Sequence, residues 1–156
     1  MDTNYVSTTV PMRLWQLAGL CSDSVRAATV VNWMVMGVYF TRELLHKMKQ
    51  IRSPQCLGCD LSESENLTHF LIHCTYYKEI REHFLPKFLE INVHLAEILE
   101  DEGKIMLSIL DPLHSKLQNI AKGWTSSKEA CTLSRQFFFN MQRKRDKLDQ
   151  EMDKTS

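Results

Sequence analysis

The spacing of cysteines and histidines between residues 56 and 74 constrains this chain more than any other feature. Cys56 and Cys59 are separated by two residues, and His69 and Cys74 follow to give Cys-x2-Cys-x9-His-x4-Cys. Cys3His is a common tetrahedral ligand set for structural Zn²⁺, and the close cysteine pair is typical of such sites. The pattern therefore predicts a zinc site with these four ligands, against the alternative that the cysteines are small buried hydrophobes.

Two histidines compete for the fourth ligand position. On a regular α-helix successive residues are rotated by about 100°, so His69 and His73 share one face while Cys74 lies on the other. His69 and Cys74 converge only if the turn between them loosens, and a regular helix would favour His73 instead. We expect His69, since four intervening residues are tolerated in zinc modules. Four protein ligands close the coordination sphere, which makes the expected site structural rather than catalytic.

Helical periodicity dominates the remaining chain, and no strand pattern is convincing. A length of 156 residues and 44% hydrophobic content suit a single globular domain with its own core. We therefore expect an all-α fold over residues 1–156, with a small Cys3His zinc knuckle inserted between helices. Its expected parts are N-terminal helices (22–52), the zinc knuckle (56–74), a helical middle (75–125) and a long basic C-terminal helix (126–153).

Individual residues predict where helices start and stop. Thr41 is an expected N-cap, and Ser126 with Glu129 forms a capping box at the start of the last helix. Gly37 is an expected stop, and Pro86 should break or kink the helix that contains it. Four methionines are expected to fill the core rather than to form a cofactor site: Met34, Met36, Met48 and Met106.

Charge is balanced overall, with 19 basic and 19 acidic residues. The net charge produces no strong electrostatic attraction between the whole chain and nucleic acid. Any binding of nucleic acid must therefore come from local patches of basic residues. Two basic segments are candidates for phosphate contact, although each can also be an ordinary solvated helix face. Their candidate residues are Arg42, Lys47, Lys49 and Arg52 in the first segment, and Arg143, Lys144, Arg145 and Lys147 in the second. The knuckle itself is acidic, which favours contact through the flanking helices.

Other functional classes find little support in the sequence. No phosphate-binding glycine loop, nucleophile elbow or paired magnesium-binding aspartates are present, so we do not expect an enzyme. The apolar run from Thr29 to Phe40 is too short to span a membrane. The first twenty residues lack a basic region followed by an apolar block, so we do not expect them to act as a secretory signal. The remaining cysteines, Cys21 and Cys131, are expected to be buried free thiols. A reducing, intracellular location in nucleus or cytoplasm follows from this cysteine usage.

The segment SPQCLGCDLSESENLTHFLIHCTYYKEIREHFLPKF resembles the zinc-binding region that follows the polymerase domain in non-LTR (LINE-type) retrotransposon reverse transcriptases. The similarity extends to VRAATVVNWMVMGVYFTRELLHKMKQI before it and to SRQFFFNMQRKRDKLD near the end of the chain. The resemblance implies Cys56, Cys59, His69 and Cys74 as zinc ligands. It also implies a role in binding template RNA or target DNA, but the polymerase's catalytic residues have no counterpart here.

Two hypotheses about function follow. The first is a non-catalytic, zinc-stabilised accessory domain that binds RNA or DNA weakly. The second is a protein-interaction or structural module without nucleic-acid binding. Three adjacent aromatics, Phe137, Phe138 and Phe139, cannot all face one core from a single helix, which would leave one for a partner or for self-association through the C-terminal helix.

Overall fold

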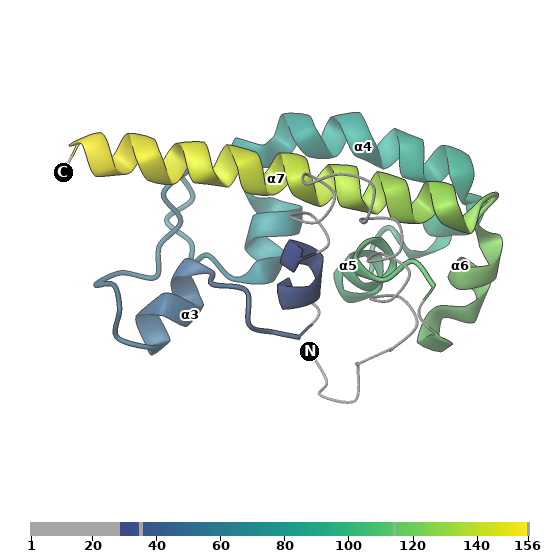
Figure 1. Cartoon of the computed structure of the whole chain (residues 1–156), viewed down its shortest axis with the longest axis horizontal. Coiled ribbons are helices and arrows are strands. Elements are labelled where there is room, and N and C mark those ends of the chain that lie inside the picture. The colour runs from purple at the N-terminus through teal and green to yellow at the C-terminus, as the bar shows by residue number, and fades with distance from the viewer. Residues whose placement is uncertain (1–28, 35, 114, 156) are drawn as a thin grey trace.

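The computed structural model describes residues 29–34, 36–113 and 115–155, and this part of the chain is largely helical (Figure 1). It contains no strand beyond an isolated antiparallel bridge between Gln55 and Ser64. The prediction of an all-α fold is therefore confirmed. A short helix over residues 29–34 is followed by α3 (Arg42–Lys47), the π-helix η2 (His69–His73), η3 (Thr75–Tyr77), α4 (Lys78–Ile91), η4 (Val93–Ile98), α5 (Glu102–Leu110), η5 (Ser115–Leu117), α6 (Gln118–Gly123) and α7 (Ser127–Thr155). Cys21 lies outside the described residues.

The long helix α7 organises the fold. It lies along α4 on one half of its length and reaches past α3 at its C-terminal end (Figure 1). The Glu129 amide donates to Ser126 Oγ at 3.2 Å, which confirms the expected start of this helix. Phe137 packs edge-on against Phe84 of α4, with ring centroids 5.6 Å apart. Within the described residues, none of the helices is both long enough and apolar enough to cross a bilayer.

Pro86 does not break α4. The helix runs from Lys78 to Ile91 and carries Pro86 inside it. Pro86 itself is exposed, whereas Phe84 and Phe88 on either side are buried in the core. Burial of two aromatic side chains outweighs the roughly 3 kcal/mol that an interior proline costs a helix. Of the expected break or kink at Pro86, the break is therefore wrong.

The three aromatic residues of α7 are more enclosed than expected. Phe137 is 4% exposed, Phe138 is fully buried, and Phe139 is partly buried. Phe137 contacts α4, and both Phe137 and Phe138 line a cavity that α5 closes on the other side. Because α7 is covered on more than one face, adjacent residues can be buried together. These side chains give no exposed aromatic row for a partner.

The boundaries near residue 40 agree with the sequence signals. Gly37 has a φ of 72°, a left-handed conformation that glycine adopts without strain, and its amide donates to the Met34 carbonyl at 3.1 Å. The Leu44 amide donates to Thr41 Oγ1 at 3.2 Å, which is the expected N-cap of α3. The chain therefore turns at Gly37 and re-enters a helix after Thr41.

The four methionines behave differently from one another. Met34 is fully buried, as expected, and Met106 is partly buried beside the cavity near α5. Met36 and Met48 are 56% and 47% exposed, so their expected place in the core is wrong. Met36 follows the helix over residues 29–34, and Met48 is the C-cap of the short helix α3. Neither belongs to a helix long enough to turn it inward.

Asp111, the C-cap of α5, is a buried carboxyl group. It is 2% exposed, and no described residue makes a hydrogen bond of good geometry to either of its oxygens. Burial raises the pKa of Asp111 to about 7, and the backbone amide of Leu113 offsets only part of that rise. The native protein therefore binds this proton more tightly than the unfolded chain does.

We expect this carboxyl group to make the domain less stable as pH rises. Between an unfolded pKa of about 3.9 and the native value, stability falls by about 1.4 kcal/mol per pH unit, and it is lowest above pH 7. Urea unfolding should show that Asp111→Asn gains about 2 kcal/mol relative to the parent between pH 5.5 and pH 8. The exposed Glu90→Gln on α4 is the control and should show no such gain. A parallel response of the two variants would refute the assignment.

Candidate metal centre

A closed loop positions the first two cysteines of the cluster. The Cys56 amide donates to the Glu63 carbonyl at 2.8 Å, and the Glu65 amide donates to the Pro54 carbonyl at 2.9 Å. Together with the bridge between residues 55 and 64, these bonds pin the base of the loop that carries Cys56 and Cys59. The loop lies between α3 and α7 (Figure 1). Backbone pairing therefore presents both thiols from one short turn.

A π-helical turn positions the other two residues. The segment His69–His73 is a π-helix, and the Cys74 amide donates to the His69 carbonyl at 2.7 Å, five residues back. On a regular α-helix, residues five apart differ by about 140° in direction. Widening the turn brings His69 and Cys74 to the same side, and such single π-turns are frequent at functional sites. The expected loosening of this turn is confirmed.

The four donor atoms fit one tetrahedral ion. Cys56, Cys59, His69 and Cys74 place their ligand atoms within 4.8 Å of one another. Cys56 Sγ and Cys74 Sγ are 3.6 Å apart, and Cys59 Sγ is 3.5 Å from His69 Nε2. A tetrahedron with metal–sulfur bonds of about 2.3 Å sets its sulfur atoms roughly 3.8 Å apart. The structure thus brings together the four residues that the sequence singled out, in a cluster that can bind a metal ion.

Hydrogen bonding fixes the orientation of the His69 ring. His69 is 3% exposed, and its Nδ1 lies 3.0 Å from Glu63 Oε2, which leaves Nε2 directed at the cysteines. A carboxylate behind a metal-binding histidine is a common arrangement that sets its tautomer. His73 is exposed and pairs with Glu102 at 2.7 Å, away from the cluster. The sequence indicates only that the knuckle is acidic and gives no sign of this role for Glu63.

The three thiols influence one another's protonation. A hydrogen bond from Cys74, with help from the Gly58 amide, lowers the pKa of Cys56 to about 5. The same bond to Cys56 raises the pKa of Cys74, and burial raises the pKa of Cys59. One thiolate therefore forms easily, and a metal ion would have to displace protons from the other two thiols.

Gly58 is required by close packing. A Cβ atom at this position would lie 2.9 Å from Cβ and Cγ of Tyr76 and 3.1 Å from Leu148 Cδ2 on α7. Such distances are too short for ordinary contacts between carbon atoms. Glycine also permits a tight turn between Cys56 and Cys59. The structure adds that the absence of a side chain at Gly58 lets the loop pack closely against both Tyr76 and α7.

A buried ion pair joins the loop to α7. Glu65 and Arg145 are 3% and 9% exposed, and Arg145 Nη2 lies 2.8 Å from Glu65 Oε1. Arg145 Nε contacts the second carboxylate oxygen at 3.3 Å, and Nη2 also donates to the Phe40 carbonyl at 2.9 Å. The Arg42 amide donates to Glu65 Oε1 at 2.9 Å. Glu65 therefore links the loop to α3 and α7 at once.

The eight basic residues proposed from sequence are not equivalent. Arg145 is enclosed by the protein, so it is removed from any surface that could meet phosphate. Arg42 donates to the backbone carbonyls of Ser53 and Gln55, and Lys144 lies 4.4 Å from the ring centre of Tyr76. Lys47 forms an ion pair with Glu43 at 3.3 Å. The remaining four side chains are exposed: Lys49, Arg52, Arg143 and Lys147.

Comparison of the chain with protein-family models, with curated proteins and with solved structures found no match. The resemblance to retrotransposon reverse transcriptases therefore stays a prediction. What the geometry establishes is a largely buried set of three thiols and one imidazole in a helical fold, with Cys59 partly exposed and with two basic segments attached to the loop through Glu65.

Proposed function

We propose that this chain is a zinc-stabilised, non-catalytic helical domain that binds RNA or DNA weakly. The observation that carries the proposal is the Cys3His cluster of Cys56, Cys59, His69 and Cys74, whose donors suit tetrahedral Zn²⁺. Four protein ligands leave no coordination position for a reactive water, which favours a structural role. The resemblance to the C-terminal region of non-LTR reverse transcriptases supports the nucleic-acid part of the proposal.

The arrangement of charge around the cluster is the second support. Glu65 contacts both the first turn of α3 and Arg145 of α7, so the two basic segments lie at the same end of the molecule (Figure 1). Sequence-independent affinity for nucleic acid comes mainly from such cations. Because acidic residues of the loop lie among them, we expect weak and strongly salt-dependent binding.

Fluorescence anisotropy with a labelled RNA and a labelled duplex DNA tests this proposal. A variant that carries Gln at Lys49, Arg52, Arg143 and Lys147 should bind more weakly at about 50 mM salt. Its log affinity should also fall less steeply with log salt, by about 0.7 to 0.9 for each phosphate that the variant no longer neutralises.

A matched control removes the same number of charges elsewhere. Lys87, Lys104, Lys122 and Lys128 are exposed on α4, α5, α6 and the start of α7. Changing all four to Gln should leave the salt slope nearly intact. If the parent protein retains no nucleic acid at about 50 mM salt, or if both variants lose affinity equally, the nucleic-acid role is rejected.

The second candidate function is a protein-interaction module, and a different surface favours it. Four large apolar side chains between residues 33 and 40 are exposed: Trp33 at 46%, Met36 at 56%, Val38 at 47% and Phe40 at 53%. Exposed large apolar side chains so close together in the chain favour a protein contact where they adjoin on the surface. Mass measured as a function of protein concentration distinguishes the two candidates. The double variant Val38→Ser/Phe40→Ser should lose any self-association of the parent chain. Its affinity for nucleic acid should stay unchanged.

A further inference from the structure

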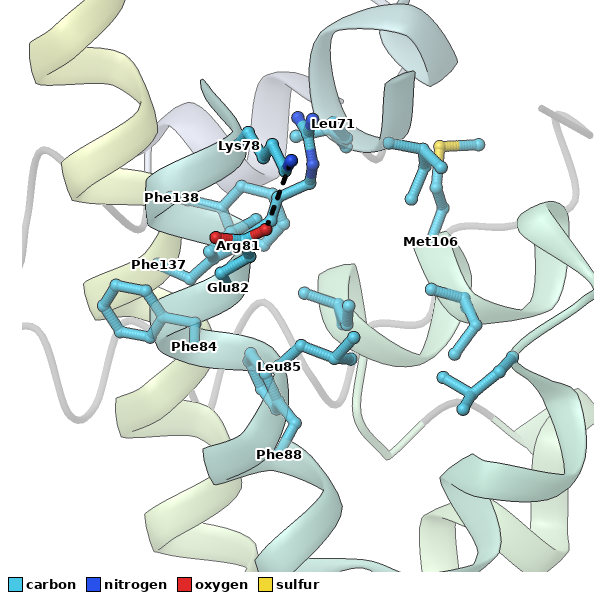
Figure 2. Close-up of a pocket in the computed structure, with 14 residues that line it drawn as sticks. Leu71, Lys78, Arg81, Glu82, Phe84, Leu85, Phe88, Met106, Phe137 and Phe138 are labelled. Carbon is cyan, nitrogen blue, oxygen red and sulfur yellow. Dashed lines mark ion pairs between the residues drawn. The ribbon is translucent and has the colours of Figure 1, made fainter. Parts of the chain in front are cut away.

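Arg81 on α4 is bonded to the backbone of the Cys3His cluster. Its Nη2 donates to the carbonyl oxygen of Cys74, one of the four clustered residues. In Figure 2 the nitrogen atoms of Arg81 lie beside Leu71 of the π-helical turn, far from Phe88 at the other end of the apolar pocket lining. The guanidinium is therefore directed at the segment that carries Cys74.

The guanidinium of Arg81 is enclosed without a carboxylate partner. Its Nη1 is buried and makes no hydrogen bond within the described chain. The next residue, Glu82, is exposed and pairs instead with Lys78 at 3.7 Å, as the dashed line in Figure 2 shows. Burial lowers the pKa of Arg81, and the negative charges of Cys74 and then Glu82 offset part of that fall. An enclosed cation is costly unless a negative charge faces it, so Arg81 needs a counter-charge on the side of Cys74.

A metal-loaded cluster supplies this negative charge. Cysteine binds a metal as the thiolate, and three thiolates outweigh the two positive charges of Zn²⁺. The carboxylate of Glu63 behind His69 adds a further negative charge. The buried guanidinium of Arg145 is already paired with Glu65. Arg81 therefore contacts the cluster with a positive charge that no described carboxylate takes up.

We propose that Arg81 is a positioning residue of the metal centre, which fixes the backbone at Cys74 and balances the net negative charge of the loaded Cys3His set. The inference rests on the proposed zinc role and adds to it a residue that does not touch the ion. The counter-charge of Arg81 is complete only when the thiols have lost their protons to metal binding, so Arg81 favours the loaded state over the metal-free state. This accounts for a guanidinium at the edge of a mostly apolar pocket.

Competition with a chromophoric chelator measures the Zn²⁺ affinity of the full chain and tests this inference. Arg81→Met should weaken Zn²⁺ binding by about 10- to 100-fold, as is typical when an outer partner of a metal ligand is lost. Arg81→Lys keeps the positive charge and should recover most of that loss. Lys78→Gln is the control, because it removes an exposed cation three residues earlier on α4. Solvent screens that charge, so the control should stay within about threefold of the parent.

A change in the charge of the donor set makes the test specific. Cys59→His replaces a partly exposed thiol with an imidazole, and the resulting Cys2His2 set carries no net charge with Zn²⁺. In this background Arg81→Met should cost about threefold or less, because the charge that Arg81 balances is gone. An equal loss in both backgrounds would show that Arg81 acts through packing alone, and it would overturn the charge-balancing role.

The outcomes separate this inference from the zinc role on which it rests. If the parent chain binds no Zn²⁺, the zinc role itself fails. If the parent binds Zn²⁺ but Arg81→Met binds it as tightly as Lys78→Gln does, or if Arg81→Lys loses as much as Arg81→Met, the role of Arg81 is rejected while the zinc site stands. Circular dichroism at saturating Zn²⁺ checks the fold, and Arg81→Gln replaces Arg81→Met if that variant loses its helical signal. If Cys59→His binds no Zn²⁺, the comparison of Arg81→Lys with Arg81→Met decides.

Discussion

His69→Gln is expected to lower metal affinity and thermal stability far more than His73→Gln, although the two histidines are only four residues apart. His69 directs Nε2 at the cysteine cluster, 3.5 Å from Cys59 Sγ, while His73 is exposed and paired with Glu102. Metal that binds only the native state stabilises it in proportion to the logarithm of its affinity. A 1,000-fold loss of affinity at fixed excess metal removes about 4 kcal/mol, or roughly 8–16 °C in melting temperature.

The measurement is metal content per chain with melting temperature, recorded for the parent and both variants with and without a chelator. Chelation should lower the melting temperature of the parent and of His73→Gln, but should have little further effect on His69→Gln. Glu63→Ala should lie between the two, because loss of a carboxylate behind a ligand histidine typically costs 10- to 100-fold in metal affinity. Equal metal content in the two histidine variants would overturn the ligand assignment.

Arg145→Met is expected to destabilise the domain by about 3–5 kcal/mol, because it leaves the buried carboxylate of Glu65 without its partner. Glu65 is 3% exposed and receives two hydrogen bonds from this arginine. The loss corresponds to a fall of roughly 6–20 °C in melting temperature for a chain of this size. Urea unfolding of the metal-loaded protein measures the effect.

Two further variants make this prediction specific. Arg143→Met changes an exposed arginine two residues earlier on the same helix, and it should alter stability by less than about 0.5 kcal/mol. Glu65→Gln/Arg145→Met removes the uncompensated charge and should recover a large part of the loss. If Arg145→Met and Arg143→Met are equally stable, the ion pair contributes nothing and the loop is held by the remaining contacts.

The sequence was sufficient for features that depend on local chemistry. The Cys-x2-Cys pair, the Thr41 cap and the start of α7 at Ser126 each rest on interactions within a few residues. The widened turn between His69 and Cys74 was the condition for choosing His69, whereas spacing alone left a regular helix with His73 as the alternative. Local preference and final structure agree at these positions.

The features that could not be predicted depend on contacts between distant residues. Arg145 looked like one more cation of a basic helix, and nothing in the sequence indicates that Glu65, 80 residues away, is its partner. Pro86 and Phe138 differ from expectation for a related reason, since α4 and α7 are packed strongly enough to keep one helix intact and to bury adjacent side chains of the other. Tertiary packing overrides local propensity in such cases.

The π-helical turn also supplies an internal reporter of site assembly. The hydrogen bond from the Cys74 amide to the His69 carbonyl joins two residues of the Cys3His cluster through the backbone itself, and Cys74 is fully buried. Exchange of that one amide hydrogen with solvent requires the wide turn to open, which also separates the two donors. A single resonance, followed by hydrogen exchange, can therefore show how often the centre comes apart while the rest of the helical core stays folded.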